Sequence, residues 1–228
     1  MKAVISGATR GIGRAIAQKL AKEEFDLVLL ARSSDVLQQC KTELTGFNIS
    51  VEVLAIDLAE KNALEMLQAN TSIFESTTLL VNNLGVYSMQ NAAELDLKVV
   101  QEQINVNLFS AITLTQFALK QSTNLKNIVN IASVMSTKAQ PFAADYSISK
   151  HAFKAWNDAL REELRTAPIK VSAIYPGSVN TSSWDGLDAD RSRMIQAEDI
   201  AEMVSCVLKM KSNTLVEEIH VSPVNFTP

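Results

Sequence analysis

The sequence predicts a doubly wound α/β fold, in which a parallel sheet of about seven strands carries helices on both faces. Two observations lead to this fold class. Short runs rich in Val and Ile alternate along the chain with longer amphipathic stretches of helical period. The runs are almost continuously apolar, as expected for parallel strands that are buried on both faces.

Each predicted strand is a short run dominated by Val, Ile or Leu. In chain order the strands are Lys2–Ser6, Asp26–Ala31, Ser50–Ile56, Thr78–Asn82, Asn127–Ala132, Lys170–Tyr175 and Glu218–Val221. The stretches between them predict helices near residues 11–24, 34–45, 59–75, 94–121, 146–166 and 197–211. In the fifth of these helices, Phe153, Trp156 and Leu160 recur at a spacing of three to four residues, which we interpret as a stripe facing the core.

Size and composition fit one large globular domain, which we expect to span residues 1–228. With 47% hydrophobic residues the chain can bury a substantial core, and it contains no repeat and no linker rich in Pro and Gly. The net charge is −4 with acids and bases interspersed, so neither nucleic acid nor an anionic membrane is an expected partner. The longest apolar runs, such as Leu27–Ala31, are too short to span a bilayer.

The start of the chain and its cysteine usage predict a cytoplasmic protein. The first strand-like run begins at Ala3, which leaves no room for a signal peptide. Cys40 and Cys206 are far apart and form no CxxC motif, which favours a reducing compartment. With two His and no metal-ligand spacing, no metal site is expected.

A glycine-rich loop follows the first predicted strand and opens the first predicted helix. It runs from Ser6 to Gly13 with the spacing Gly7-x-x-x-Gly11-x-Gly13. Glycine allows a tight turn and a close approach of phosphate, and the helix N-terminus supplies free N–H groups and a partial positive charge. The strand–turn–helix context therefore indicates a dinucleotide-binding loop. The residues assigned to the cofactor here are Gly7, Thr9, Arg10, Gly11, Ile12 and Gly13.

The end of the second predicted strand favours NADP(H) over NAD(H) as the cofactor. An acidic residue there would bind the ribose 2′-hydroxyl of NAD, but the strand ends in Ala31-Arg32-Ser33. Arg32 can instead bind a 2′-phosphate, with Arg10 as a second cation and Ser33 as a hydrogen-bond donor. The alternative is that Arg32 is only a solvated surface charge.

Tyr146 and Lys150 form a candidate proton-transfer site. They are four residues apart in a predicted helix and so lie on one face, roughly 6 Å from each other. An ammonium at such a distance could lower the pKa of a phenol, ordinarily about 10, by roughly 3 at most. A phenol of this kind can exchange a proton with a carbonyl oxygen near neutral pH. Taken alone, the pair is more often a half-buried Tyr beside a solvated Lys.

Together these motifs resemble the short-chain dehydrogenase/reductase family over essentially the whole chain. The glycine loop, the Asn82–Gly85 stretch after the fourth strand and the Pro176–Thr181 stretch after the sixth occur in the family's order. The catalytic residues that the resemblance implies are Asn107, Ser133, Tyr146 and Lys150. The closest likeness is to 3-oxoacyl-[acyl-carrier-protein] reductases and related NADPH carbonyl reductases.

The resemblance also implies a Rossmann fold and further contacts to the cofactor. These contacts are assigned to Arg32, Ser33, Asp57, Leu58, Asn83, Gly85, Tyr146, Lys150, Pro176, Gly177, Val179 and Thr181. Asp57 would contact the adenine, and the segment from Pro176 to Thr181 would contact the nicotinamide. The chain departs from the family pattern at Leu84, where Ala is usual, and in a short, polar stretch between Thr181 and Gln196.

The activity that these residues imply is NADPH-dependent reduction of a ketone or aldehyde to an alcohol. Tyr146 would donate the proton and Ser133 would hold the carbonyl oxygen. Lys150 would lower the pKa of Tyr146 and bind the nicotinamide ribose, while Asn107 would hold a water beside Lys150. The alternative is a catalytically silent NADP(H)-binding regulatory or scaffold protein on the same fold.

The sequence leaves the carbonyl substrate open among 3-oxoacyl thioesters, small diketones, aldehydes, steroids and pterins. By resemblance, we also expect a homodimer or homotetramer that forms through the helices near residues 94–121 and 146–166.

Overall fold

A parallel sheet forms the centre of the computed structural model, which describes residues 1–224. Within those residues the sheet has seven strands in the order β3-β2-β1-β4-β5-β6-β7, and each neighbouring pair is parallel. The strands are β1 (Lys2–Ser6), β2 (Asp26–Ala31), β3 (Val51–Ala55), β4 (Thr77–Asn82), β5 (Asn127–Ile131), β6 (Lys170–Pro176) and β7 (Glu218–Val221). The doubly wound fold expected from the sequence is thereby confirmed.

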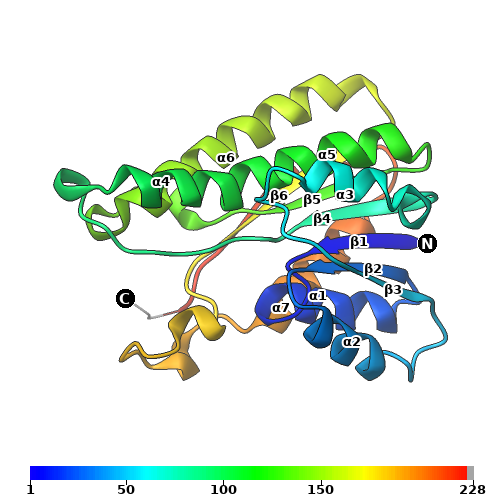
Figure 1. Cartoon of the computed structure of the whole chain (residues 1–228), viewed down its shortest axis with the longest axis horizontal. Coiled ribbons are helices and arrows are strands. Elements are labelled where there is room, and N and C mark those ends of the chain that lie inside the picture. Colours follow the sequence, from blue (N-terminus) through cyan, green and yellow to red (C-terminus); the bar gives the residue numbers. More distant parts are fainter. Residues whose placement is uncertain (225–228) are drawn as a thin grey trace.

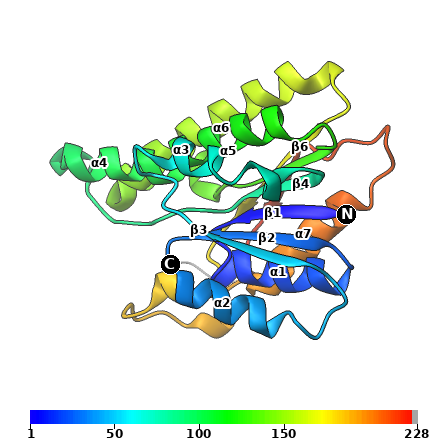
Figure 2. The ribbon, with the colours of Figure 1, turned by 45° about the vertical axis from the view of Figure 1, so that its right-hand side comes forward.

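Helices cover both faces of the sheet, as Figure 1 and Figure 2 show. One layer contains α1 (Gly11–Lys22), α2 (Ser34–Glu43) and α7 (Ala197–Leu208). The other contains α3 (Ala63–Gln68), α4 (Leu97–Ile104), α5 (Ser110–Gln121) and α6 (Ala144–Glu163). Because both faces are covered, the strands can be apolar at nearly every position.

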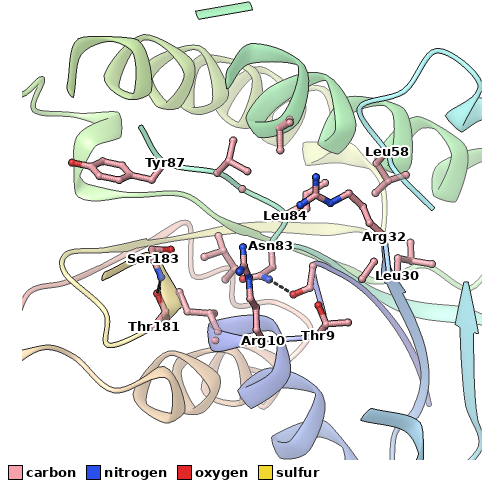
Figure 3. Close-up of a pocket in the computed structure, with 18 of the residues that line it drawn as sticks. Thr9, Arg10, Leu30, Arg32, Leu58, Asn83, Leu84, Tyr87, Thr181 and Ser183 are labelled. Atoms are coloured by element: carbon pink, nitrogen blue, oxygen red, sulfur yellow. Dashed lines mark hydrogen bonds between the residues drawn. The ribbon is translucent and has the colours of Figure 1, made fainter. Parts of the chain in front are cut away.

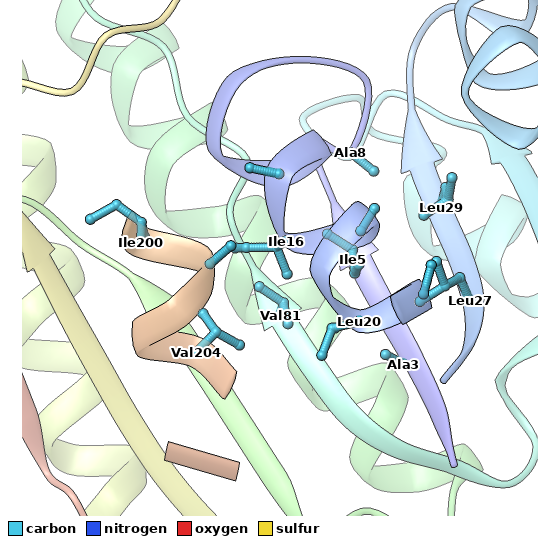
Figure 4. Close-up of a cluster of buried hydrophobic side chains, with 14 of the residues drawn as sticks. Ala3, Ile5, Ala8, Ile16, Leu20, Leu27, Leu29, Val81, Ile200 and Val204 are labelled. Atoms are coloured by element: carbon cyan, nitrogen blue, oxygen red, sulfur yellow. The ribbon is translucent and has the colours of Figure 1, made fainter. Parts of the chain in front are cut away.

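Successive residues of one strand fill two different cores. Ile5 of β1 lies in a buried cluster with Ile16 of α1 and Ile200 of α7 (Figure 4). Its neighbour Val4 lies on the opposite face of the sheet, in a cluster with Leu114 of α5. Each such side chain stabilises the fold by about 1.5–3 kcal/mol when it is fully buried. The two cores hold β1 rigidly from both sides, and the glycine loop begins where this strand ends.

Three predicted helices differ from the observed ones in ways that bear on the site. The helix predicted near 59–75 is interrupted, because α3 ends at Gln68 and a separate 3₁₀ turn follows at Thr71–Phe74. The helix predicted near 94–121 contains a π-helical segment at Asn105–Phe109 between α4 and α5. The helix predicted from residue 146 begins at Ala144, so that Tyr146 already lies within its first turn.

The connections from β1 and β4 leave the sheet in opposite directions. β1 leads through α1 to β2 on one side, whereas β4 leads through α4 and α5 to β5 on the other. Doubly wound sheets bind ligands in the crevice that opens at such a point, outside the carboxyl ends of the strands. Among residues 1–224, no helix combines the length and the apolar character needed to cross a bilayer.

Candidate active site

A cavity of about 440 Å³ opens at the carboxyl ends of β1, β2 and β4. Its wall brings together many of the residues predicted from the sequence (Figure 3). Those that line it are Gly7, Thr9, Arg10, Gly11, Ile12, Arg32, Ser33, Asp57, Leu58, Asn83, Gly85, Tyr146, Lys150 and Thr181. The predicted residues that lie outside the wall are Gly13, Asn107, Ser133, Pro176, Gly177 and Val179.

The glycine loop has a shape that side chains would block. Gly7 has a φ of 64°, in the left-handed region that favours glycine. A Cβ on Gly13 would lie 2.2 Å from the carbonyl oxygen of Gly7. The amide of Asn83 donates to the carbonyl oxygens of Ser6 and Gly7 at 3.1 Å each, and so ties the loop to the end of β4. The loop is therefore a rigid cradle that leaves its backbone open to the cavity.

The N-terminus of α1 faces this cradle as an anion site. Its N-cap is Arg10, and no side chain in residues 1–224 caps the helix there. The first N–H groups of a helix have no intrahelical partner, and the helix dipole adds positive charge to them. Gly11 and Ile12 of this first turn line the cavity. The donors therefore fit the pyrophosphate of a dinucleotide.

Cations lie at the end of β2, where the 2′-position of an adenosine ribose is expected. Figure 3 shows the guanidinium groups of Arg10 and Arg32 reaching over the cavity from two different loops. The Arg32 side chain is 69% exposed, and Nη1 lies 3.9 Å from Oδ2 of Asp57. This weak, solvated pair leaves Arg32 free to take a phosphate as an additional partner. Ser33 caps α2, where its oxygen accepts from the N–H of Val36 at 3.4 Å.

Tyr146 and Lys150 line the cavity beyond the glycine loop, and Ser133, outside the wall, lies within hydrogen-bond reach of Tyr146. Lys150 is buried, with Nζ 3.4 Å from the carbonyl oxygen of Ile131, and burial lowers its pKa from 10.5 to about 8. Burial raises the pKa of Tyr146 from 10.0 to about 12, and a hydrogen bond with Ser133 opposes part of this rise. The expected lowering of the Tyr146 pKa by Lys150 is therefore wrong for the protein alone. Loss of hydration outweighs an ammonium that points toward Ile131.

Asn107 lies in the π-helical segment, where it is fully buried. Its Oδ1 accepts from the N–H of Val86 at 2.8 Å, and its Nδ2 donates to the Val86 carbonyl oxygen at 3.0 Å. These bonds leave one lone pair of Oδ1 unused, so the expectation that Asn107 holds a water beside Lys150 stays a prediction. The same bonds fix the segment that follows β4. Short π-helical segments are frequent at functional sites.

The segment after β6 reaches the cavity only at its end. Gly177 donates its N–H to the carbonyl oxygen of Val221 at 2.8 Å, and Val179 pairs with Ile195. These contacts hold the segment behind the wall, and Thr181 is the residue of it that lines the cavity. A Cβ on Gly11 would lie 2.9 Å from Cγ2 of Thr181, so the two loops approach closely at this point.

Tyr87 is a functional candidate that sequence reasoning missed. Its ring lines the cavity and packs edge to face on Tyr146, with ring centroids 4.9 Å apart and an interplanar angle of 78°. The available signal was an aromatic residue two positions after Gly85, at the carboxyl end of a central strand. Further lining residues that were not predicted are Leu30, Ala31, Val36, Ile56, Leu84, Val86, Val106, Ile131, Ala132, Ser182 and Ser183.

Known proteins resemble this chain in both sequence and fold. The family model for short chain dehydrogenase matches residues 1–192. An uncharacterized oxidoreductase of Staphylococcus epidermidis is 30% identical over 227 residues, which cover 97% of this chain and 96% of that protein. The mouse dehydrogenase/reductase SDR family member 7B is 32% identical over 198 residues, covering 83% of this chain and 61% of that protein.

Solved structures agree with this relationship. An alcohol dehydrogenase from the archaeon Thermococcus sibiricus, complexed with 5-hydroxy-NADP, has a TM-score of 0.90 at 27% identity, covering 100% of this chain and 98% of that one. A point variant of the actinorhodin polyketide ketoreductase with NADPH has a TM-score of 0.85 at 26% identity, covering 97% and 95%. With a matching family model, a matching relative and a matching fold, the chain belongs to the short-chain dehydrogenase family of oxidoreductases.

Proposed function

We propose that this protein reduces a ketone or aldehyde to an alcohol with NADPH as the reductant. The observation that carries the proposal is the position of Tyr146, which lies on the wall of the dinucleotide cavity with Lys150 one turn further along the same helix. A pKa of about 12 keeps this phenol protonated at neutral pH, as a proton donor must be. In the reverse direction of this reversible hydride transfer, the same oxygen of Tyr146 would take the proton back from the alcohol.

The cavity fits NADP(H) at both of its recognition points. Gly7, Gly11 and the N-terminus of α1 would hold the pyrophosphate, and Arg32 with Arg10 would hold the 2′-phosphate. When bound, the cofactor supplies the hydride. The archaeal alcohol dehydrogenase and the ketoreductase, which were solved with 5-hydroxy-NADP and with NADPH, support the same preference.

Each remaining residue serves the proton or the carbonyl oxygen. Tyr146 donates its proton to the oxygen, and Ser133, which is within hydrogen-bond reach of Tyr146, positions that oxygen. The ammonium of Lys150 stabilises the phenolate that this transfer leaves behind, and it would also bind the nicotinamide ribose. We assign Asn107 the role of fixing Val86, and hence the wall next to Gly85.

We further propose a cytoplasmic homo-oligomer. Phe109 and Ile148 are 48% and 42% exposed on the π-helical segment and α6, which pack against each other. An apolar surface on neighbouring helices is typical of an interface between copies. Sedimentation of the purified protein at micromolar concentration should show a dimer or tetramer, and a monomer would contradict this part of the proposal.

The test is NADPH consumption with a panel of carbonyl compounds, including acetoacetyl-CoA, small diketones and aldehydes. We expect at least one class to be reduced at a rate proportional to enzyme, with NADPH preferred to NADH. A titration of NADPH against the protein alone gives the control. Tight NADPH binding without turnover on any member of the panel would instead support the silent regulatory alternative.

A further inference from the structure

A fully buried carboxylate lies directly beside the candidate proton donor. Asp145, at 0% exposure, precedes Tyr146 at the start of α6. Ser88 donates a hydrogen bond to its Oδ2, whereas its Oδ1 has no hydrogen-bond partner in the described part of the chain. Leaving a carboxylate oxygen unpaired in the interior lowers stability. The group therefore points to a role other than holding the fold together.

A chain of buried polar side chains connects this carboxylate to Asn107. Gln103 bridges the two ends, with one amide atom 2.7 Å from Ser88 Oγ and the other 2.7 Å from Asn107 Nδ2, whichever way its amide is turned. Asn107 Nδ2 also donates to Ser149 Oγ at 2.9 Å. Asp145, Gln103, Asn107 and Ser149 are each at most 3% exposed. Water is thus largely excluded from these four side chains, whereas Ser88 is partly exposed, and the bonds of the network depend on one another.

The network holds the short segment Val86–Ser88 at both of its ends. Asn107 binds the backbone of Val86 on both sides, and Ser88 is bound by Asp145. Between them, the Tyr87 ring packs edge to face on Tyr146, 4.9 Å away. Figure 3 shows Tyr87 at the end of the cavity remote from Arg32 and Leu58, across from Ser183. This is the end where the carbonyl substrate would meet Tyr146.

We propose that Asp145 is a positioning residue, which acts through Ser88 to fix Tyr87 as the aromatic wall of the carbonyl-binding end. Tyr87 then packs against the apolar or aromatic substituent of the carbonyl compound and presents the oxygen to Tyr146. This inference rests on the proposed function and deepens it, because it assigns the specificity of the site to Tyr87. Oδ1 of Asp145 remains without a hydrogen bond, and the stability lost in this way is the energetic cost of holding Ser88 with a buried carboxylate.

A purely structural role for Asp145 makes a different prediction. An acidic residue in the first turn of a helix stabilises the helix dipole, by about 0.3–1 kcal/mol near the surface. Replacement of Asp145 would then lower the melting temperature by the same amount whether or not Ser88 or Tyr87 has also been replaced. A positioning role instead requires that the effects of changing Asp145, Ser88 and Tyr87 depend on one another.

The kinetic test is a double-mutant cycle between Asp145→Asn and Ser88→Ala. Each variant should lower kcat/KM for the carbonyl substrate on the order of 10- to 100-fold, while NADPH affinity stays within about twofold of the wild type. The kcat/KM of the double variant should equal that of the less active single variant, within about twofold.

A third substitution tests the link to the ring. In a Tyr87→Leu background, Asp145→Asn should lower kcat/KM little further. Glu163→Gln, which removes an exposed carboxylate from the same helix, is the matched control. Additive losses, or an unchanged kcat/KM, would overturn the proposal.

A second measurement tests positioning without any turnover. Amide hydrogen exchange should accelerate in residues 84–91 of both Asp145→Asn and Ser88→Ala, while residues 7–13 exchange as in the wild type. Equal protection of residues 84–91 in wild type and variants would refute the anchor. If the wild type reduces no carbonyl compound but this exchange pattern is found, the proposed function fails and the anchor stands. Ser88→Ala keeps the test decisive should Asp145→Asn fail to fold.

Discussion

The ammonium of Lys150 donates to the carbonyl oxygen of Ile131 at 3.4 Å, and its Nζ lies over the Tyr146 ring, 5.8 Å from the ring centre. Burial nevertheless raises the pKa of Tyr146 to about 12, so the phenol keeps its proton at neutral pH despite the nearby ammonium. Lys150 therefore does not strip Tyr146 of its proton in advance. It lowers the energy of the phenolate once the substrate has taken the proton.

The rate of carbonyl reduction should fall as the pH rises through about 8. Lys150 has its pKa lowered from 10.5 to about 8 by burial, so it carries its charge below that pH and loses it above. The Tyr146 phenol, with a pKa of about 12, stays protonated throughout this range. A profile of kcat/KM from pH 6 to 10 measures the free enzyme's ionisations. An activity that increases between pH 7 and 9 would contradict the assignment.

Lys150→Met should abolish activity and yet stabilise the fold at neutral pH. The pKa of Lys150 is about 8 in the folded protein and 10.5 in the unfolded chain, so the unfolded state binds more protons between these two values. Below pH 8, burial of the ammonium therefore lowers the free energy of unfolding of the wild type by about 3 kcal/mol. This loss of stability disappears as the pH rises past 10.5. Urea unfolding at pH 7 should show the variant as the more stable protein, and at pH 10.5 the difference should vanish. A destabilised variant at pH 7 would be inconsistent with a buried ammonium that costs stability.

Arg32→Asp should shift the cofactor preference from NADPH toward NADH. Removal of one charge-assisted bond to the 2′-phosphate costs about 1.5–3 kcal/mol, which corresponds to a rise in the NADPH KM of roughly 10- to 100-fold. The new carboxylate can accept a hydrogen bond from the 2′-hydroxyl of NADH. Arg165→Asp, on an exposed arginine in the 3₁₀ turn that follows α6, is the control with the same change of charge. An unaltered ratio of the kcat/KM for NADPH to that for NADH would show that Arg32 does not bind the 2′-phosphate.

Gly13→Ala should weaken cofactor binding far more than a glycine change elsewhere. Its Cβ would lie 2.2 Å from the Gly7 oxygen and 2.5 Å from Nδ2 of Asn83, so the loop would have to move. Gly46→Ala is the matched control, because a Cβ there meets nothing within 4 Å. NADPH titration should show a loss of at least about tenfold for the first variant and none for the second. Equal affinities for both would mean that the loop does not hold the dinucleotide.

Local patterns were sufficient to predict the sheet and the cofactor loop. The strand edges follow from runs such as Asp26–Ala31, and the glycine spacing of residues 7–13 is read within a single strand–turn–helix unit. The Tyr146 pKa could not be predicted in the same way, because it depends on burial, and the spacing to Lys150 carries no information about that. The Ser88–Asp145 bond joins segments from distant parts of the chain, and no local pattern marks either residue. Polar residues in such positions look like ordinary surface residues until the fold buries them.

The most direct test of the central claim compares Tyr146→Phe with the wild type in NADPH consumption and in NADPH binding. The substitution removes the phenol oxygen and keeps the ring that packs against Tyr87. We predict a loss of turnover of about 10²-fold or more, since general acid catalysis contributes on that scale, with NADPH affinity unchanged. Near-normal turnover of a carbonyl substrate by this variant would show that Tyr146 is not the proton donor.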